Sequence, residues 1–150
     1  MNQPFSYIHP SAEIADNVVI EPFVTISKDV VIGEGTWIGP HVTIMEGARI
    51  GKNCKIFPGA VISAIPQDLK YKGEKAIVEI GNNVTIREYV TVNKGTEAAM
   101  KTVIGDNSVG IATKGVTGNV EFDEKGDIKN GALTLMTYKG GARTTLAVIR

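Results

Sequence analysis

The sequence predicts an all-β protein, most of it a parallel β-helix. Three observations predict this fold: an aliphatic residue at every sixth position of residues 8–62, a small or β-branched residue four positions after each, and turn residues between the repeats. A period of six fits no α-helix, but it is typical of hexapeptide repeats, in which short strands meet at tight turns and stack coil on coil. The aliphatic positions are Ile8, Ile14, Ile20, Ile26, Ile32, Ile38, Ile44, Ile50, Ile56 and Ile62.

The small residue of each repeat precedes the next isoleucine by two positions, so the pleat of a strand points both side chains into one core. These small residues are Ala12, Val18, Val24, Val30, Thr36, Val42, Ala48, Cys54 and Ala60. We interpret Cys54, the only cysteine, as a packing residue and predict no disulfide. The corners hold residues that adopt a positive φ at low cost. They are Gly33, Gly39, Gly47, Gly51, Gly59, Asn17 and Asn53.

Charge and composition exclude several classes of protein. The 150 residues include 16 Lys and Arg against 16 Asp and Glu, so the net charge is zero. No run of basic residues predicts a nucleic-acid or membrane surface, and no apolar stretch has the length of a membrane span. The N-terminus lacks the apolar segment of a signal peptide, so we expect a cytoplasmic protein.

The repeat is interrupted twice and resumes in phase each time. Residues 66–79 are polar and irregular, yet Ile80 follows Ile62 by three hexapeptides. A second excursion, residues 97–102, leads to Ile104. We interpret both as loops that leave a rigid scaffold and return in register, which is where sites are usually built.

The repeat fails at Gly110, where an aliphatic residue is due. Turn residues and strand formers then predict three strands that pair as an antiparallel β-meander. The predicted strands are residues 118–122, 132–138 and 143–149. Val116, Phe122 and Ile128 keep the old phase, so a further coil of the β-helix remains an alternative.

These patterns divide the chain into three segments. Residues 1–108 form the β-helix, 109–114 a junction, and 115–150 a segment of β-hairpins. A β-helix that stops in the middle of a stack exposes unpaired N–H and C=O groups, which invites aggregation. We therefore expect the last segment to act as a cap on that edge.

Three motifs resemble those of a known family. They are Gln-Asp-Leu-Lys-Tyr-Lys-Gly-Glu over residues 67–74, Ile-Arg-Glu-Tyr-Val-Thr-Val-Asn-Lys-Gly-Thr over 86–96 and Val-Ile-Gly-Asp-Asn over 103–107. With them, residues 1–108 resemble the UDP-N-acetylglucosamine acyltransferases of lipid A biosynthesis. The resemblance implies a left-handed β-helix that forms a homotrimer with active sites between subunits, and no cofactor. There the hydroxyl of UDP-N-acetylglucosamine attacks the thioester of a hydroxyacyl-acyl carrier protein.

The same resemblance assigns substrate-binding positions. Gln67, Asp68 and Lys70 match the sugar-nucleotide loop of the family, and Asn93 stands where familiar members have a histidine. Asparagine can keep a substrate hydrogen bond there. A solvated ion pair between Asp68 and Lys70, worth about 0 to 1 kcal/mol, remains the alternative interpretation.

Acyl transfer to a sugar hydroxyl needs a general base of near-neutral pKa and donors for the developing oxyanion. The resemblance implies a histidine from a His-x-x-His-Asp segment directly after Asn107, but this chain has no such segment. Its two histidines, His9 and His41, belong to the first and second coils. We expect both to be surface or turn residues far from the loops, and we therefore predict no catalytic residue.

A second resemblance covers the C-terminal segment. Residues 115–127 and 131–141 resemble the C-terminal end of periplasmic branched-chain amino-acid-binding proteins. Two unrelated resemblances predict a chimeric chain. The leading hypothesis is a truncated or chimeric acyltransferase that keeps substrate-loop residues, lacks the base and is inactive by itself. The alternative is a structural trimeric β-helix module without a ligand, and a branched-chain amino-acid-binding fragment is the weakest hypothesis.

Other conspicuous side chains have a structural interpretation. Arg87 and Glu88 open a hexapeptide, so we expect them to point outward as a salt bridge. Phe23 and Trp37 lie at or near corners, where an aromatic residue covers a surface or a subunit interface. Three acidic residues of the last segment are Asp123, Glu124 and Asp127. They lack the regular alternation and the closing glutamate of a calcium loop, so we predict a turn and no metal site.

Overall fold

A computed structural model describes residues 5–69 and 71–109 with their side chains, and the backbone of four strands after residue 109. The chain divides into two compact units, residues 1–111 and 112–150. The described residues form strands, turns and bends but no helix, so none of them belongs to a helix that is long and apolar enough to cross a membrane.

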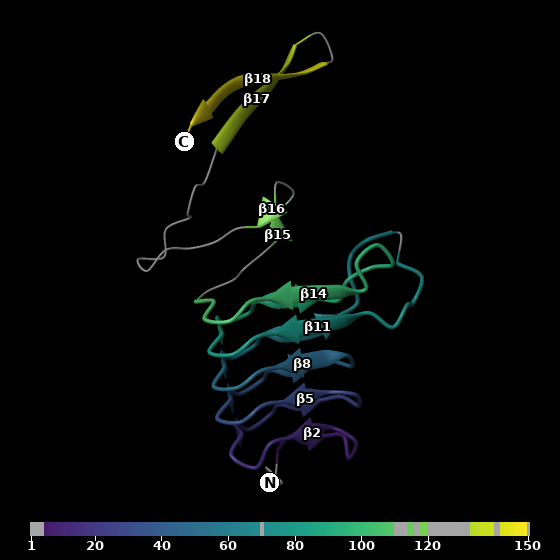
Figure 1. Cartoon of the computed structure of the whole chain (residues 1–150), viewed down its shortest axis with the longest axis vertical. Helices are drawn as coiled ribbons and strands as arrows, with labels where there is room; N and C mark the ends of the chain where they lie inside the picture. The colour runs from purple at the N-terminus through teal and green to yellow at the C-terminus, as the bar shows by residue number, and fades with distance from the viewer. Residues whose placement is uncertain are drawn as a thin grey trace. The chain divides into compact units, whose positions relative to one another are not determined.

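The first unit is a β-helix of three parallel sheets (Figure 1). The first sheet contains β1 (Tyr7–Ile8), β4 (Thr25–Ile26), β7 (Thr43–Ile44), β10 (Val61–Ala64) and β13 (Thr91–Asn93). The second contains β2 (Glu13–Ile14), β5 (Val31–Ile32), β8 (Ala48–Ile50), β11 (Ile77–Ile80) and β14 (Lys101–Ile104). The third contains β3 (Val19–Ile20), β6 (Trp37–Ile38), β9 (Lys55–Ile56) and β12 (Thr85–Ile86). A single parallel bridge from Thr85 to Val109 continues the third sheet.

The isoleucines of the repeat build the core. Within the first sheet, four of them pair in register from coil to coil: Ile8, Ile26, Ile44 and Ile62. All but Ile8 are 0% exposed, which confirms the predicted column. Cys54 is also buried, with its Sγ 3.1 Å from the carbonyl oxygen of Gly81. Its loss of hydration raises the pKa of the thiol, and the interpretation of Cys54 as a packing residue is confirmed.

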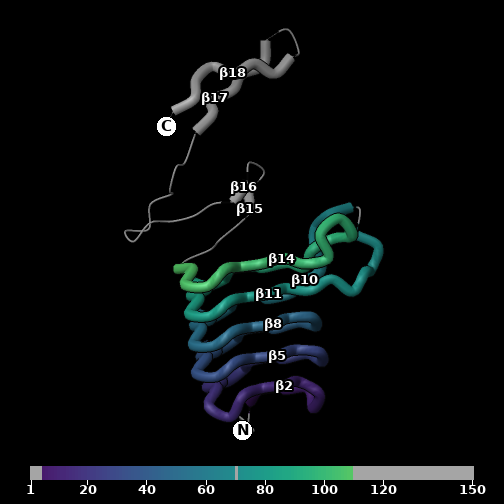
Figure 2. Tube along the Cα trace, in the orientation of Figure 1, coloured from purple at the N-terminus to yellow at the C-terminus, as the bar shows by residue number. Residues whose placement is uncertain are grey.

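Both interruptions of the repeat leave from the corner between the first and second sheets, and they project side by side (Figure 2). The first loop, residues 65–76, joins β10 to β11, and the second loop, residues 94–100, joins β13 to β14. Each returns to the ladder earlier than the sequence predicts, because Ile77 pairs with Lys101 and the two strands run parallel from there. The predicted loop ends at 79 and 102 were therefore too late.

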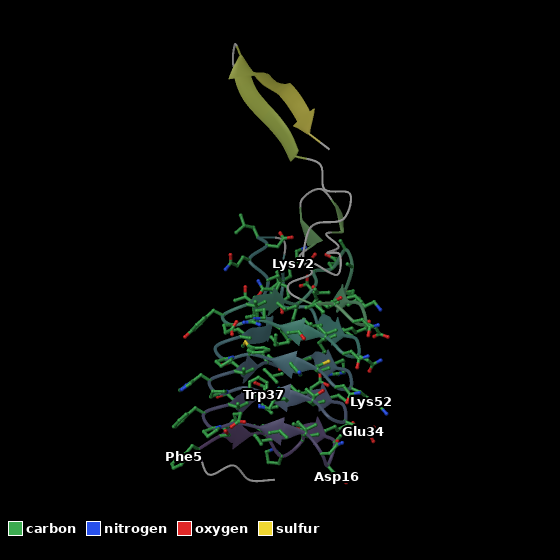
Figure 3. All side chains as sticks on the ribbon, turned by 90° about the vertical axis from the view of Figure 1, so that its left-hand side faces the viewer. Phe5, Asp16, Glu34, Trp37, Lys52 and Lys72 are labelled. Carbon is green, nitrogen blue, oxygen red and sulfur yellow. The ribbon has the colours of Figure 1, made fainter. Side chains whose placement is uncertain are left out.

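The corner between the second and third sheets is held by side chains that bond to the backbone of the next coil. The Oδ1 of Asn82 accepts a hydrogen bond from the Lys52 amide at 2.8 Å, and the Oδ1 of Asp106 accepts one from the Asn82 amide at 2.7 Å. Gly51 packs so closely on the next coil that a Cβ there would lie 2.5 Å from the carbonyl oxygen of Gly81. On the same corner, exposed Lys52 and Glu34 form an ion pair at 2.9 Å (Figure 3).

The corner between the third and first sheets carries a feature that the sequence did not predict. A positive φ is found there at Phe23, His41 and Tyr89, as well as at Gly59. The Phe23 ring lies between its neighbours, 5.7 Å from the Phe5 centroid and 5.0 Å from that of His41 (Phe5 is marked in Figure 3). The Tyr89 ring occupies the space that a Cβ on Gly59 would take. Ring contacts between coils accompany the strained backbone, which persists only where its surroundings hold it.

The second unit contains two antiparallel strand pairs. The pair β15 (Lys114–Gly115) and β16 (Gly118–Asn119) is short, and β17 (Leu133–Lys139) and β18 (Ala142–Ile149) form a longer hairpin. The hairpin confirms the two last predicted strands. Of the first predicted strand, residues 118–119 form β16, which pairs with β15, and residues 120–122 lie outside the described residues. Val116, Phe122 and Ile128, which carried the alternative of a further coil, lie outside the described residues.

Candidate functional site

The candidate site is the pair of loops at one corner of the β-helix. Strand register places Ala64, the last residue of β10, beside Asn93, the last residue of β13. Gln67 and Asp68 follow Ala64 within a few residues and are exposed, whereas Asn93 is half-buried. The structure thus brings three of the four predicted binding residues to one corner. Lys70 lies outside the described residues, so its proposed ion pair with Asp68 remains a prediction.

Internal hydrogen bonds shape the first loop. The Tyr71 amide donates to the Asp68 carbonyl oxygen at 3.0 Å, and the Tyr71 hydroxyl donates to the Glu74 carbonyl oxygen at 3.3 Å. That carbonyl oxygen also accepts from the Ala76 amide at 2.8 Å, just before the chain enters β11. These bonds close the loop into two successive turns, and Asp68 belongs to the first of them.

The Glu74 carboxylate connects the first loop to the second. Its Oε2 accepts a hydrogen bond from the Lys72 amide at 2.7 Å, and its Oε1 accepts one from the Glu97 amide at 2.8 Å. Backbone amides that donate to the ionised carboxyl, together with the charge of Lys72, hold the pKa of Glu74 below its usual value. Glu74 lies within a sequence motif, but its role cannot be predicted from the sequence, because a contact across two loops leaves no trace in local spacing.

A groove of about 450 Å³ runs along the same corner. Tyr71 and Lys94 line it beside the loops, and His9 lines it in the first coil. One groove therefore extends from His9 to the loops. The ring is nevertheless distant: His9 and Ser63 occupy this corner three coils apart, which at about 4.8 Å for each strand spacing is roughly 14 Å. The His9 Nδ1 is 2.9 Å from the Ser11 hydroxyl.

Several other predictions concern the surface near the third sheet. Arg87 and Glu88 form the expected outward salt bridge at 2.9 Å. The Arg87 guanidinium also lies 4.5 Å from the ring centroid of Phe57, which packs edge-on against Trp37. The indole of Trp37 donates to Glu21 at 3.1 Å, so this half-buried aromatic cluster covers the surface of the β-helix. The prediction that it also covers a subunit interface stays a prediction.

Within residues 5–69 and 71–109, the described side chains form no group of three or more His, Cys, Asp or Glu that could hold a metal ion. The acidic residues of the predicted turn, Asp123, Glu124 and Asp127, lie outside the described residues. The two loops offer amide, carboxylate and hydroxyl groups that can form hydrogen bonds with a ligand rich in hydroxyls. Lys94, which lines the groove beside them, adds a positive charge.

Comparison with known proteins identifies the repeat. Residues 29–64 match the bacterial transferase hexapeptide family (six repeats). This part of the chain is therefore similar to hexapeptide-repeat transferases. Among solved structures, the UDP-N-acetylglucosamine acyltransferase from Bacteroides fragilis is 51% identical to this chain, with a TM-score of 0.72. The match covers 75% of this chain and 44% of the Bacteroides chain. The enzyme from Francisella novicida is 44% identical with a TM-score of 0.70, and the match covers 73% of this chain and 40% of the Francisella chain. These likenesses confirm the left-handed β-helix.

The curated relatives that this chain resembles carry a consistent name. The acyl-acyl-carrier-protein:UDP-N-acetylglucosamine O-acyltransferase of Akkermansia muciniphila is 48% identical over 106 residues, 71% of this chain and 41% of the relative. The protein of the same name from Trichlorobacter lovleyi is 52% identical over 106 residues, which are 70% of this chain and 41% of that relative. The chain thus spans about two fifths of the length of these relatives.

Proposed function

We propose that the two loops bind a UDP-sugar as part of an acyltransferase site that accepts acyl groups from acyl carrier protein. The observation that supports the proposal is that Gln67 and Asp68 follow β10 and Asn93 ends β13 at one corner of the β-helix, where Ala64 pairs with Asn93. Amide and carboxylate groups can form hydrogen bonds with sugar hydroxyls. The names of the relatives, which specify UDP-N-acetylglucosamine and acyl carrier protein, support the same assignment.

We further propose that this chain lacks the general base of the reaction. A base must lie within about 3 Å of the hydroxyl that it deprotonates, directly or through one water. His9 lies three coils from the loops, and His41 stacks on Phe23 at a different corner. The 150-residue sequence contains no third histidine. Carboxylates of the loops are poor substitutes, because Glu74 is bound to two amides and its pKa is lowered further from neutrality.

The proposed assembly is a homotrimer whose subunits complete each site. Support comes from large apolar side chains that are exposed on one copy of the chain and that a second copy could cover. Ile65 is 60% exposed and Leu69 is 105% exposed, both on the first loop, and Tyr89 is 82% exposed. We propose the cytoplasm as the compartment, in line with the expectation from the sequence. A chimeric origin of residues 115–150 stays a prediction.

A thioester-release assay with hydroxyacyl-acyl carrier protein and UDP-N-acetylglucosamine tests the proposal. We expect no measurable turnover, because the base contributes about 10² to 10⁴-fold in general acid–base catalysis. A titration followed by NMR should still show saturable binding of the UDP-sugar, with a dissociation constant of about 1 mM (roughly −4 kcal/mol) or weaker. Binding should be lost in Asp68→Ala.

Two variants serve as controls for the missing base. Robust turnover that His9→Ala or His41→Ala abolishes would show that a histidine acts after all. Turnover that is indifferent to both would point to a base elsewhere in the chain. Absence of any UDP-sugar binding would instead favour the alternative of a structural module without a ligand.

A further inference from the structure

We propose that Glu74 is a positioning residue that joins the two loops into a single binding surface and thereby fixes Asp68 relative to Asn93. This inference rests on the proposed function, because it assumes that the surface binds a UDP-sugar. It is drawn from contacts of this chain: one carboxylate, set between two excursions of the β-helix, uses one oxygen for each of them.

The loops are anchored to the β-helix at their ends but need support between them. The Lys94 amide donates to the Ala64 carbonyl oxygen at 2.9 Å where the two loops begin, and the Ile77 amide donates to the Met100 carbonyl oxygen at 3.0 Å where they end. The stretches between these anchors run outside the ladder (Figure 2). Glu74 crosses that interval by accepting from the Glu97 amide, so it supplies a contact in the part of the loops that the strands do not constrain.

A short chain of hydrogen bonds connects Glu74 to Asp68, a predicted binding residue. Glu74 receives the Tyr71 hydroxyl at its carbonyl oxygen, and Tyr71 in turn donates its amide to the carbonyl oxygen of Asp68. Displacement of Glu74 from the second loop therefore moves the turn that carries Asp68. Asn93, at the base of the second loop, keeps its place through the register of β13 with β10.

The carboxylate is the form that makes this arrangement possible. Both partners of Glu74 are N–H donors, and only an ionised carboxylate offers two acceptor oxygens without a hydrogen that would face a donor. Hydrogen bonds to an ionised group are about twice as strong as neutral ones. Glutamine at this position can accept one of the two amides, but its NH₂ group then faces the other.

The test uses the full chain, labelled with ¹⁵N, as wild type and three variants. Glu74→Gln removes the second acceptor, and Glu74→Asp keeps the charge but shortens the reach by one methylene. Glu79→Gln is the matched control, because Glu79 lies on β11 and forms an exposed ion pair with Lys101 at 2.9 Å. Amide hydrogen exchange at Lys72 and Glu97 and a titration with UDP-N-acetylglucosamine are measured for each protein.

We expect Glu74→Gln to accelerate exchange of the Glu97 amide by about tenfold or more, as the loss of a charged hydrogen bond implies. Its affinity for the UDP-sugar should fall roughly two- to thirtyfold, the range found for residues that act without touching the ligand. Glu74→Asp should lie between Glu74→Gln and wild type. Glu79→Gln should match wild type in both measurements.

The outcomes separate this inference from the proposed function. If wild type binds no UDP-sugar but Glu97 exchange responds to Glu74→Gln, the proposed function fails while the link between the loops stands. If wild type binds and Glu74→Gln binds equally well, the positioning role is overturned, whether or not exchange changes. Should Glu74→Gln misfold, circular dichroism will show it, and the intermediate behaviour of Glu74→Asp decides in its place.

Discussion

Substitution of Ile44 by alanine should destabilise the β-helix strongly. Ile44 is 0% exposed and lies between Ile26 and Ile62, which are also 0% exposed. The change removes three carbon atoms, which at about 0.8 kcal/mol for each buried methylene costs roughly 2.4 kcal/mol of transfer free energy. A cavity term adds to this, and measured values for such changes are about 2 to 5 kcal/mol.

The upper half of that range is expected because the site cannot collapse. The strand is held to the next coil by hydrogen bonds from the Thr43 amide to the Ala60 carbonyl oxygen at 3.0 Å and from the Met45 amide to the Ile62 carbonyl oxygen at 2.9 Å. It is held to the preceding coil by the Ser27 amide, which donates to the Ile44 carbonyl oxygen at 2.9 Å. We therefore expect about 4 kcal/mol for Ile44→Ala and about 1 kcal/mol for Ile44→Val. Urea unfolding followed by circular dichroism measures both, with amide exchange in β4 and β10 to detect partial unfolding of a linear repeat.

The control is Thr43→Ala, because Thr43 precedes Ile44 on the same strand but points to the other face of the sheet. Its free energy of unfolding should change by about 0.5 kcal/mol or less. Equal, small losses for Thr43→Ala and Ile44→Ala would refute the placement of Ile44 in a close-packed core.

Four further predictions follow from other contacts. Gly51→Ala should destabilise the fold, because its Cβ would lie 2.5 Å from the Gly81 carbonyl oxygen; a thermal melt unchanged from wild type would contradict this close approach. Cys54 should resist thiol-specific reagents in the native state and react on unfolding, since burial raises the pKa of its thiol; rapid native labelling would show an exposed cysteine. The hydrogen bond and charge of Lys52 lower the pKa of Glu34 from 4.5, so this contribution to stability is present above pH 4.5 and is lost as the pH falls through the lowered pKa; carboxyl NMR of Lys52→Met should find that pKa returned toward 4.5. Deletion of residues 115–150 should lower solubility if they cap the last coil, and a soluble, unchanged 1–110 chain would exclude the cap.

Much of the β-helix can be predicted from the sequence because its rule is local and repeated. One isoleucine in every six residues fixes which side chains share a column, and the register of Ile26 with Ile44 follows without knowledge of distant contacts. Corners are less predictable. Glycine and asparagine signal a positive φ, as at Gly47 and Asn53, but nothing local in Phe23 or Tyr89 announces one. Their conformation depends on rings from neighbouring coils, such as the stack of Phe23 on His41.

The candidate site was predictable only in part, for the same reason. The return of Ile80 in phase showed that residues after Ile62 form an excursion, and motif resemblance selected Asp68 within it. Glu74 was overlooked because its role depends on a residue 23 positions away, the amide of Glu97. Loop ends were misplaced because strands lengthen when two excursions return together, as Ile77 and Lys101 do.

Function in this fold depends on where a repeat is broken rather than on the repeat itself. A coil that continues without interruption presents short turns that leave little room for a ligand, whereas an excursion lengthens the chain at one corner and keeps the register elsewhere. Two excursions on adjacent coils start about 4.8 Å apart, close enough for one carboxylate to bond to both. The β-helix therefore sets the distance between the loops. In the proposal made above, the hydrogen bonds of Glu74 to both loops then fix Asp68 relative to Asn93.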